Sequence, residues 1–220
     1  MESHTVKILK TEYVTQDVRR FRVEKPEDYK FEPGQATEVT IKGKEEKVGK
    51  GPFTFTSLNE EPELEFTIKI YDEGLTKELS KLETGNELVI HDVWGSITYK
   101  GPGVFLAGGA GVTPFIAILK QLFKVGKIKN NVLIFSNKTE DDIILKDEFD
   151  QMLGKNFINV LTREKSDKYY SQHIDEVLIN KLVKDFNQYF YICGPDKFVE
   201  DIKSILKNLG VTDDKIVIEK

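Results

Sequence analysis

The chain has 220 residues, of which 39% are hydrophobic and 31% charged, and its formal net charge is −5 at pH 7. It contains no apolar run of about 18 residues and no sustained basic stripe, which argues against a membrane span and against nucleic acid as the main partner. The N-terminal residues lack the basic and apolar regions of a secretory signal, so we expect a cytoplasmic protein. The single cysteine, Cys193, excludes an intramolecular disulfide framework and a cluster held by four thiolates of one chain.

Short strands separated by turn signals fill the first hundred residues. In one of them Phe66, Ile68 and Ile70 alternate with polar residues, which predicts a strand with one buried and one exposed face. A short helix is expected over Thr76–Leu82. The pattern predicts an antiparallel β-barrel or sandwich, with strands at Thr5–Thr15, Arg19–Val23, Ala36–Ile41, Phe53–Leu58, Glu63–Tyr71 and Glu87–His91.

After Lys100-Gly101-Pro102-Gly103 the pattern changes to strands that alternate with helices. The strands are continuous apolar runs, as in a parallel sheet covered on both faces, so we expect a doubly wound α/β domain. The chain should therefore consist of two domains, at residues 1–99 and 103–220. The predicted strands are Val104–Ala107, Val132–Ser136, Ile158–Thr162, Tyr189–Cys193 and Lys215–Ile218, and the predicted helices are Pro114–Val125, Leu145–Leu153, Ile174–Lys184 and Asp196–Leu209.

A glycine-dense loop, Gly108–Thr113, joins an apolar strand to a helix. Thr113 is predicted as the N-cap and Pro114 as the first helical residue, and the free N–H groups of such a helix start favour a phosphate. The loop is not the G-x-G-x-x-G fingerprint, because Pro114 stands where the third glycine should be. The turn Cys193–Asp196 also follows a strand. If the two strands are neighbours, both loops should flank one nucleotide-binding crevice.

Six segments in order carry a resemblance to a known family. Together they resemble the ferredoxin–NADP reductase superfamily, in particular its short bacterial flavodoxin- and flavin-reductase-like members. The resemblance implies an N-terminal antiparallel barrel that holds FAD and a C-terminal α/β domain that holds NAD(P)H. The segments are Pro33-Gly34-Gln35, Gly51–Ser57, Gly74-Leu75-Thr76, Val93–Ile97 (which includes Ser96), Ala107–Pro114 and Cys193-Gly194-Pro195.

For the flavin, the resemblance puts the Thr54 hydroxyl near the flavin N5 and the ring of Phe53 against the isoalloxazine. Gly51 replaces the arginine that pairs with the pyrophosphate in the family, a loss of about one to a few kcal/mol of affinity unless Lys50 substitutes. The FAD contacts implied in this way are Phe53, Thr54, Thr56, Ser57, Lys69, Ile70, Tyr71, Gly74, Leu75 and Thr76.

For the nicotinamide nucleotide, Cys193 has two interpretations: an inert buried residue, or the family residue that packs beside the nicotinamide C4 and orients it. Lys138 and Arg163 favour NADPH over NADH, but Glu140, Asp141, Asp142 and Glu164 lie close in sequence and the choice stays open. No metal site is expected. The implied NAD(P)H contacts are Gly109, Ala110, Gly111, Thr113, Ser136, Lys138, Arg163, Cys193, Gly194 and Pro195.

The implied activity is hydride transfer from NAD(P)H to FAD, followed by electron transfer to a separate acceptor. That acceptor is an electron carrier protein (ferredoxin or flavodoxin), free flavin or an oxygenase. The lysine-bearing segment 42–50 is either a solvated hairpin or a guide for an acidic carrier. Two other hypotheses are a non-enzymatic flavin- or nucleotide-binding regulatory module, indicated by the altered flavin motif, and FMN in place of FAD.

Overall fold

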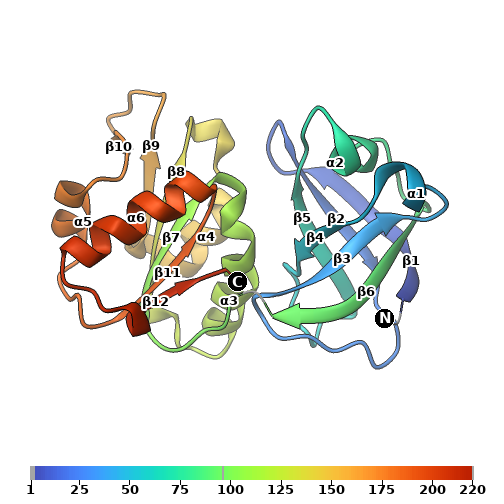
Figure 1. Cartoon of the computed structure of the whole chain (residues 1–220), viewed down its shortest axis with the longest axis horizontal. Coiled ribbons are helices and arrows are strands. Elements are labelled where there is room, and N and C mark those ends of the chain that lie inside the picture. The colour runs from blue at the N-terminus through green and yellow to red at the C-terminus, as the bar shows by residue number, and fades with distance from the viewer. Residues whose placement is uncertain (1–2, 96, 220) are drawn as a thin grey trace. The chain divides into compact units, whose positions relative to one another are not determined.

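The computed structural model describes residues 3–95 and 97–219 (Figure 1). Ser96, which belongs to the fourth family segment, lies outside the described residues. The contacts divide the chain into two compact units. The first comprises Met1–Ser96 together with Thr113–Gln121, and the second comprises Ile97–Val112 together with Leu122–Lys220. In the described part of the chain, no helix has the length and apolar character needed to cross a membrane.

The first unit contains a curled six-stranded antiparallel sheet with the strand order β4-β3-β6-β1-β2-β5. An isolated β-bridge between Phe55 and Phe66 joins the chain after β4 to β5, so the curled sheet brings its two edges together at this point. This confirms the predicted antiparallel barrel. Its elements are β1 (Ser3–Tyr13), β2 (Val18–Glu24), β3 (Gln35–Ile41), α1 (Glu45–Val48), β4 (Gly51–Thr54), β5 (Glu63–Lys69), α2 (Gly74–Leu79) and β6 (Glu87–Gly95).

Aromatic side chains fill the centre of the barrel. The ring of Phe55 stacks on Phe31 at a centroid distance of 4.2 Å and contacts Phe66 at 5.2 Å and Tyr29 at 6.0 Å. Phe55 and Phe66 are both fully buried. Because Phe55 directly follows Thr54, this core also fixes the backbone of the predicted flavin motif.

The strand predicted over Phe53–Leu58 is wrong in its bounds, because the chain changes partner there. The residues up to Thr54 pair with β3, and the N–H of Phe55 still bonds to Gln35. The N–H of Thr56 bonds instead to the carbonyl of Glu65 on β5, at 2.8 Å. The strand predicted to end at His91 continues to Gly95, because β6 bulges and then pairs again with the start of β3.

The second unit contains a six-stranded sheet with the order β10-β9-β8-β7-β11-β12, in which all pairs are parallel. The strand order reverses beside β7, which lies between β8 and β11. The strands are β7 (Gly103–Gly108), β8 (Val132–Asn137), β9 (Phe157–Leu161), β10 (Tyr170–Ser171), β11 (Tyr189–Cys193) and β12 (Ile216–Ile218), and the helices are α3 (Thr113–Lys124), α4 (Lys146–Leu153), α5 (Glu176–Leu182) and α6 (Asp196–Asn208).

Helices cover both faces of this sheet. Apolar residues of α5 and α6, including Leu178 and Ile202, pack with Leu106 and Ile192 of the strands. The neighbouring residues along the strands point the other way, and Phe135 of β8 contacts Phe149 of α4 at 6.4 Å. In Figure 1, α6 crosses the near side of the sheet and α4 lies behind it. The predicted doubly wound fold is confirmed.

The start of α3 differs from the prediction. A 3-10 turn over Gly109–Val112 leads directly into α3, so Thr113 is the first residue of the helix and not its N-cap, and Pro114 is the second. The 3-10 turn supplies acceptors for some of the backbone N–H groups at the helix start, which a capping side chain would otherwise bind. The helix predicted from Ile174 starts at Glu176, because the Asp175 carboxylate accepts the N–H of Leu178 and caps it.

The segment between the predicted domains is anchored within the second unit. The hydroxyl of Tyr191 accepts the N–H groups of Lys100 and Gly101, at 2.8 and 3.0 Å, and donates to the carbonyl of Gly101 at 2.8 Å. Its ring stacks on Phe105 at 4.4 Å. Burial raises the pKa of Tyr191 to about 12, so the phenol stays protonated and keeps all three hydrogen bonds.

Candidate cofactor sites

The two central residues of the flavin motif lie at the end of β4. Thr54 pairs with Ala36 of β3 and is 9% exposed. In the described part of the chain its hydroxyl makes no hydrogen bond, which leaves it available to a ligand. Phe53 is half-buried and packs against the barrel core with one part of its ring. The arrangement fits a flavin, since a free hydroxyl and a partly open aromatic face are what the ring system needs here.

The chain after β5 brings the second group of predicted flavin residues together. The N–H of Tyr71 donates to the Thr76 hydroxyl at 3.0 Å, which folds residues 71–76 into one turn, and Gly74 has a φ of +70° that favours glycine. Tyr71 is 58% exposed, while Ile70 packs on the core. Lys69, at the end of β5, forms an ion pair with Asp17 at 2.6 Å.

Gly51 lies beside the same turn. A Cβ on Gly51 would meet the Cδ2 atom of Leu75, in the first turn of α2, at 3.2 Å. The position where the family has arginine is therefore next to the helix start that the family uses for the pyrophosphate. Lys50 forms an ion pair with Glu38, so it would have to leave this partner to replace the missing arginine.

The substitution Gly51→Arg is therefore expected to tighten FAD binding. The new guanidinium supplies charge-assisted hydrogen bonds to the pyrophosphate, and the flexible end of Leu75 can move by the few tenths of an ångström required. We expect the dissociation constant for FAD to fall about tenfold or more, as measured by fluorescence titration of the cofactor-free protein. Gly51→Ala is the control, because it adds the Cβ without the charge. Equal affinities of the two variants would contradict the expectation.

Thr56 and Ser57, also predicted as flavin contacts, turn their hydroxyls to other residues. The Thr56 hydroxyl donates to the Glu65 carboxylate at 2.9 Å, and the Ser57 hydroxyl accepts the N–H of Glu65 at 2.9 Å. Both residues are almost fully buried.

The burial of Glu65 differs from the prediction. The alternation of β5 predicts Glu65 on the exposed face of the strand, but the residue is 6% exposed. The residues that cover it come from β2 and α3, which a local sequence pattern does not reveal.

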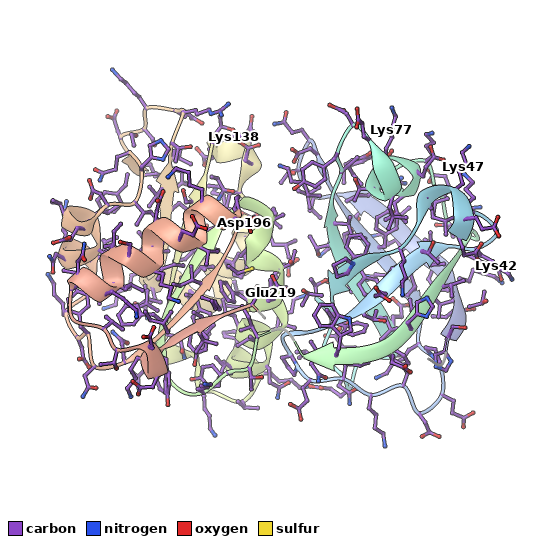
Figure 2. The ribbon with its side chains drawn as sticks, viewed as in Figure 1. Lys42, Lys47, Lys77, Lys138, Asp196 and Glu219 are labelled. Carbon is purple, nitrogen blue, oxygen red and sulfur yellow. The ribbon has the colours of Figure 1, made fainter. Side chains whose placement is uncertain are left out.

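The lysine-bearing segment 42–50 does not form a free basic surface. Lys42 pairs with Glu87 at 2.7 Å and Lys44 with Glu78 at 3.1 Å, and Lys50 pairs with Glu38. The hydrogen bonds from Lys81 and Lys44 hold the pKa of Glu78 at about 2, so this carboxylate stays charged. Figure 2 shows Lys42 and Lys47 extending from the surface of the first unit. Most of the positive charge is thus balanced by barrel carboxylates.

In the second unit, the glycine loop and the Cys-Gly-Pro turn lie against each other. Their strands, β7 and β11, are neighbours, as the crevice hypothesis requires. A Cβ on Gly111 would lie 2.4 Å from the Cys193 carbonyl oxygen and 2.4 Å from the Gly194 nitrogen, and one on Gly194 would lie 3.2 Å from the backbone of Gly108. This is the point where the strand order reverses, and nucleotides bind at such points in open α/β sheets.

Cys193 is buried at the end of β11, and its Sγ lies 3.5 Å from Oε2 of Glu219. Burial, together with the negative charge of Glu219, raises the pKa of this thiol far above its ordinary value. The thiol therefore stays protonated and is not a nucleophile. This agrees with either interpretation of Cys193, the inert residue or the orienting one. Sequence reasoning missed Glu219, because only the fold brings it to the thiol.

The predicted adenosine region lies at the ends of β8 and β9. The N–H of Arg163 bonds to the carbonyl of Lys138 at 2.9 Å, so the two cations come from adjacent backbone positions, and both are exposed. Figure 2 labels Lys138 at this edge of the sheet. Of the nearby carboxylates, Glu164 accepts the N–H of Glu140. Hydrogen bonds from Tyr169 and Lys146 lower the pKa of Glu140, so its carboxylate is charged and already bound to these two side chains.

The fold combines an antiparallel barrel with a parallel sheet, and two family models identify these units as oxidoreductase domains. The model of oxidoreductase FAD-binding domains matches residues 5–99, and that of oxidoreductase NAD-binding domains matches residues 105–204. The chain is also similar in structure to a ferredoxin NADP+ reductase from Neisseria gonorrhoeae with bound FAD and NADP, with a TM-score of 0.84, 21% identity and coverage of 98% of this chain and 97% of that one.

Two curated relatives are similar in sequence. The reductase component of propane 2-monooxygenase from Rhodococcus jostii (strain RHA1) is 26% identical over 97% of this chain and 62% of its own length. A plasma membrane-associated coenzyme Q6 reductase of Saccharomyces cerevisiae is 30% identical over 80% of this chain and 60% of its own length. The chain therefore spans less than two thirds of either relative. It combines an oxidoreductase FAD-binding domain with an oxidoreductase NAD-binding domain, and it shares the fold of the ferredoxin NADP+ reductase named above.

Proposed function

We propose that this protein is a reductase that takes a hydride from NAD(P)H onto FAD and passes the electrons to a separate acceptor. The observation that carries the proposal is the backbone contact between Gly111 and the Cys193–Gly194 turn, in a chain whose other unit is an FAD-binding barrel. When bound, the flavin supplies the redox chemistry, and no general base is needed for the hydride step.

The residues of the chain have binding and orienting roles in this proposal. Thr54 offers its hydroxyl at the flavin edge, and Phe53 offers an aromatic face. The turn at residues 71–76 receives the pyrophosphate through its backbone. On the nucleotide side, the backbone of Gly109–Gly111 and Gly194 allows close approach, and Cys193, held neutral, packs beside the nicotinamide without exchanging a proton.

The electron donor and acceptor are left to experiment. Lys138 and Arg163 support NADPH, while the exposed Asp141 opposes a 2′-phosphate. The relatives are named for a monooxygenase and for a quinone, which supports an acceptor separate from this chain. A ferredoxin or a flavodoxin is one such acceptor. The paired lysines of segment 42–50 weaken the hypothesis that this segment guides an acidic carrier.

The test is an anaerobic titration of the FAD-reconstituted protein with NADH and, separately, with NADPH. We expect the oxidised flavin absorbance near 450 nm, an approximate and generic flavin property, to bleach with at least one donor. Mass spectrometry of the released cofactor distinguishes FAD from FMN. A bound flavin that stays oxidised with both donors would reject the reductase and favour the regulatory module.

A further inference from the structure

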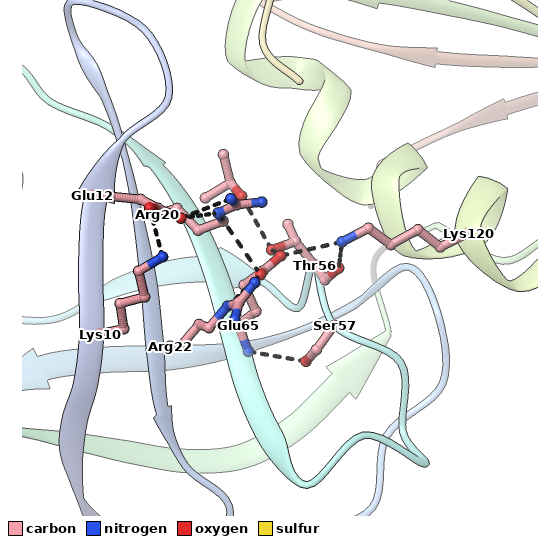
Figure 3. A network of polar contacts seen from close by, with 9 residues as sticks. Lys10, Glu12, Arg20, Arg22, Thr56, Ser57, Glu65 and Lys120 are labelled. Atoms are coloured by element: carbon pink, nitrogen blue, oxygen red, sulfur yellow. Dashed lines mark hydrogen bonds and ion pairs between the residues drawn. The ribbon is translucent and has the colours of Figure 1, made fainter. Parts of the chain in front are cut away.

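A buried carboxylate in the barrel has no role in the chemistry proposed above. Among residues 3–95 and 97–219, Glu65 is the one acidic side chain that is buried, with 7% of the side chain exposed. Figure 3 shows it at the centre of a polar network that joins β1, β2, β5, the chain after β4, and α3. An isolated buried charge is unfavourable, so its partners decide what it does.

Glu65 holds the segment that directly follows the flavin motif. Its Oε1 accepts the Thr56 hydroxyl at 2.9 Å, its N–H donates to the Ser57 hydroxyl at 2.9 Å, and its carbonyl accepts the Thr56 N–H at 2.8 Å. The Thr56 hydroxyl also lies 3.1 Å from that of Thr67. Three hydrogen bonds between one residue and a two-residue segment fix that segment in a single conformation.

The same carboxylate binds cations from two directions. Lys120, in the part of α3 that belongs to the first unit, lies 3.3 Å from Oε1 and donates to the carbonyl of Thr56 at 3.1 Å. On the other side the Nε atoms of Arg22 and Arg20 lie 3.4 and 4.0 Å from Oε2. Glu12 pairs with Arg20 at 2.7 Å and shares its charge. Lys120 thus contacts both the carboxylate and the segment that the carboxylate holds.

The charge state of Glu65 follows from these partners. Burial works to raise its pKa, but the charges of Lys120 and Arg20 and the Thr56 hydrogen bond outweigh burial and hold the pKa below its ordinary value. Glu65 is therefore ionised at neutral pH. A neutral amide in its place would leave the cations without their buried partner.

We propose that Glu65 is a positioning residue of the flavin site, which acts by holding Thr56 and Ser57 and, through Lys120, the first turns of α3. The inference rests on the proposed function, since it assigns the segment at residues 53–57 to the flavin. Thr54 lies two residues before Thr56 on the same chain. A shift of Thr56 therefore moves the hydroxyl and ring that would meet the flavin, and displacements of about 1 Å at such sites cost up to about a hundredfold in rate.

The experiment compares wild type with Glu65→Gln and Lys120→Met. Hydrogen exchange of residues 55–65 is measured in the cofactor-free proteins, followed by FAD affinity and the rate of flavin reduction at saturating NAD(P)H. We expect faster exchange in this segment, a dissociation constant for FAD raised about tenfold or more, and a slower reduction step, with larger effects for Glu65→Gln. Glu87→Gln, which replaces a partly exposed, ion-paired carboxylate of the same barrel, is the matched control and should change none of these.

Each outcome has one meaning. Unchanged exchange in both variants would overturn the holding role, and faster exchange with unchanged FAD affinity and reduction rate would overturn the positioning role. Lys120→Met leaves Glu65 paired with its arginines, so it reports on the network even if Glu65→Gln does not fold. A wild-type protein that binds no FAD rejects the proposed function and the positioning role together, whereas the exchange measurement still reports whether Glu65 holds the segment.

Discussion

Replacing Gly111 with alanine is expected to destabilise the protein and to weaken nicotinamide nucleotide binding together. The new Cβ would lie 2.4 Å from both the carbonyl oxygen of Cys193 and the nitrogen of Gly194. These are backbone atoms, so either the glycine loop or the Cys-Gly-Pro turn must move. Overpacking of this kind costs about 1–3 kcal/mol, which corresponds to a melting temperature lower by several degrees for a chain of this size.

Two measurements on the Gly111→Ala variant check this expectation. Thermal unfolding should show the loss of stability, and the KM for NAD(P)H should rise about tenfold or more, because the displaced backbone no longer allows close approach. Gly95→Ala is the control: Gly95 has no heavy atom within 4 Å of the added carbon and no positive φ. If the two variants have the same KM, the loop contact has no bearing on nucleotide binding.

Phe55→Ala should strongly destabilise the first unit and should also release the flavin. The ring is fully buried, stacks on Phe31 and contacts Phe66, so truncation leaves a cavity where the two edges of the barrel meet. Such truncations cost about 3–5 kcal/mol. Because Phe55 joins Thr54 to Thr56, the loosened core also frees the flavin motif.

Denaturant unfolding and FAD titration of the Phe55→Ala variant measure the two effects. Leu9→Ala is the control, because Leu9 is 38% exposed and its removal leaves little cavity. We expect the control to stay close to wild type in both measurements. A Phe55→Ala protein that is destabilised but keeps wild-type FAD affinity would show that the packing of the core does not determine FAD binding.

Much of the fold could be predicted, because local patterns determine it. The continuous apolar strands after residue 103 predict a parallel sheet. The glycine loop after Ala107 predicts the edge of that sheet at which a nucleotide would bind. The strand bounds near Thr54 could not be predicted, since the chain there leaves one partner strand for another. The predicted start of α3 at Pro114 is one residue too late, because a 3-10 turn leads directly into a helix that begins at Thr113.

The candidate site could be predicted in its segments but not in its supporting contacts. Glu65 looks like an exposed residue of an alternating strand, and only its contacts with Lys120, Arg22 and Thr56 show why it is buried. The pairing of Lys50 with Glu38 is equally invisible in the sequence, although it bears on whether Lys50 can replace the missing arginine. Such pairs depend on which strands become neighbours: Lys50 meets Glu38 across the β3–β4 pairing, and Glu65 meets Arg22 across the β2–β5 pairing.

The anchored segment around Lys100 and Gly101 affects how this chain can be divided for separate expression. A cut within residues 100–103, where the composition suggests a linker, would separate groups that Tyr191 binds from the piece that carries Tyr191. A fragment ending there would also lack residues 113–121, and with them Lys120, which the contacts assign to the first unit. The two predicted domains follow one another along the chain, but each fragment produced by such a cut would lack residues that pack against it.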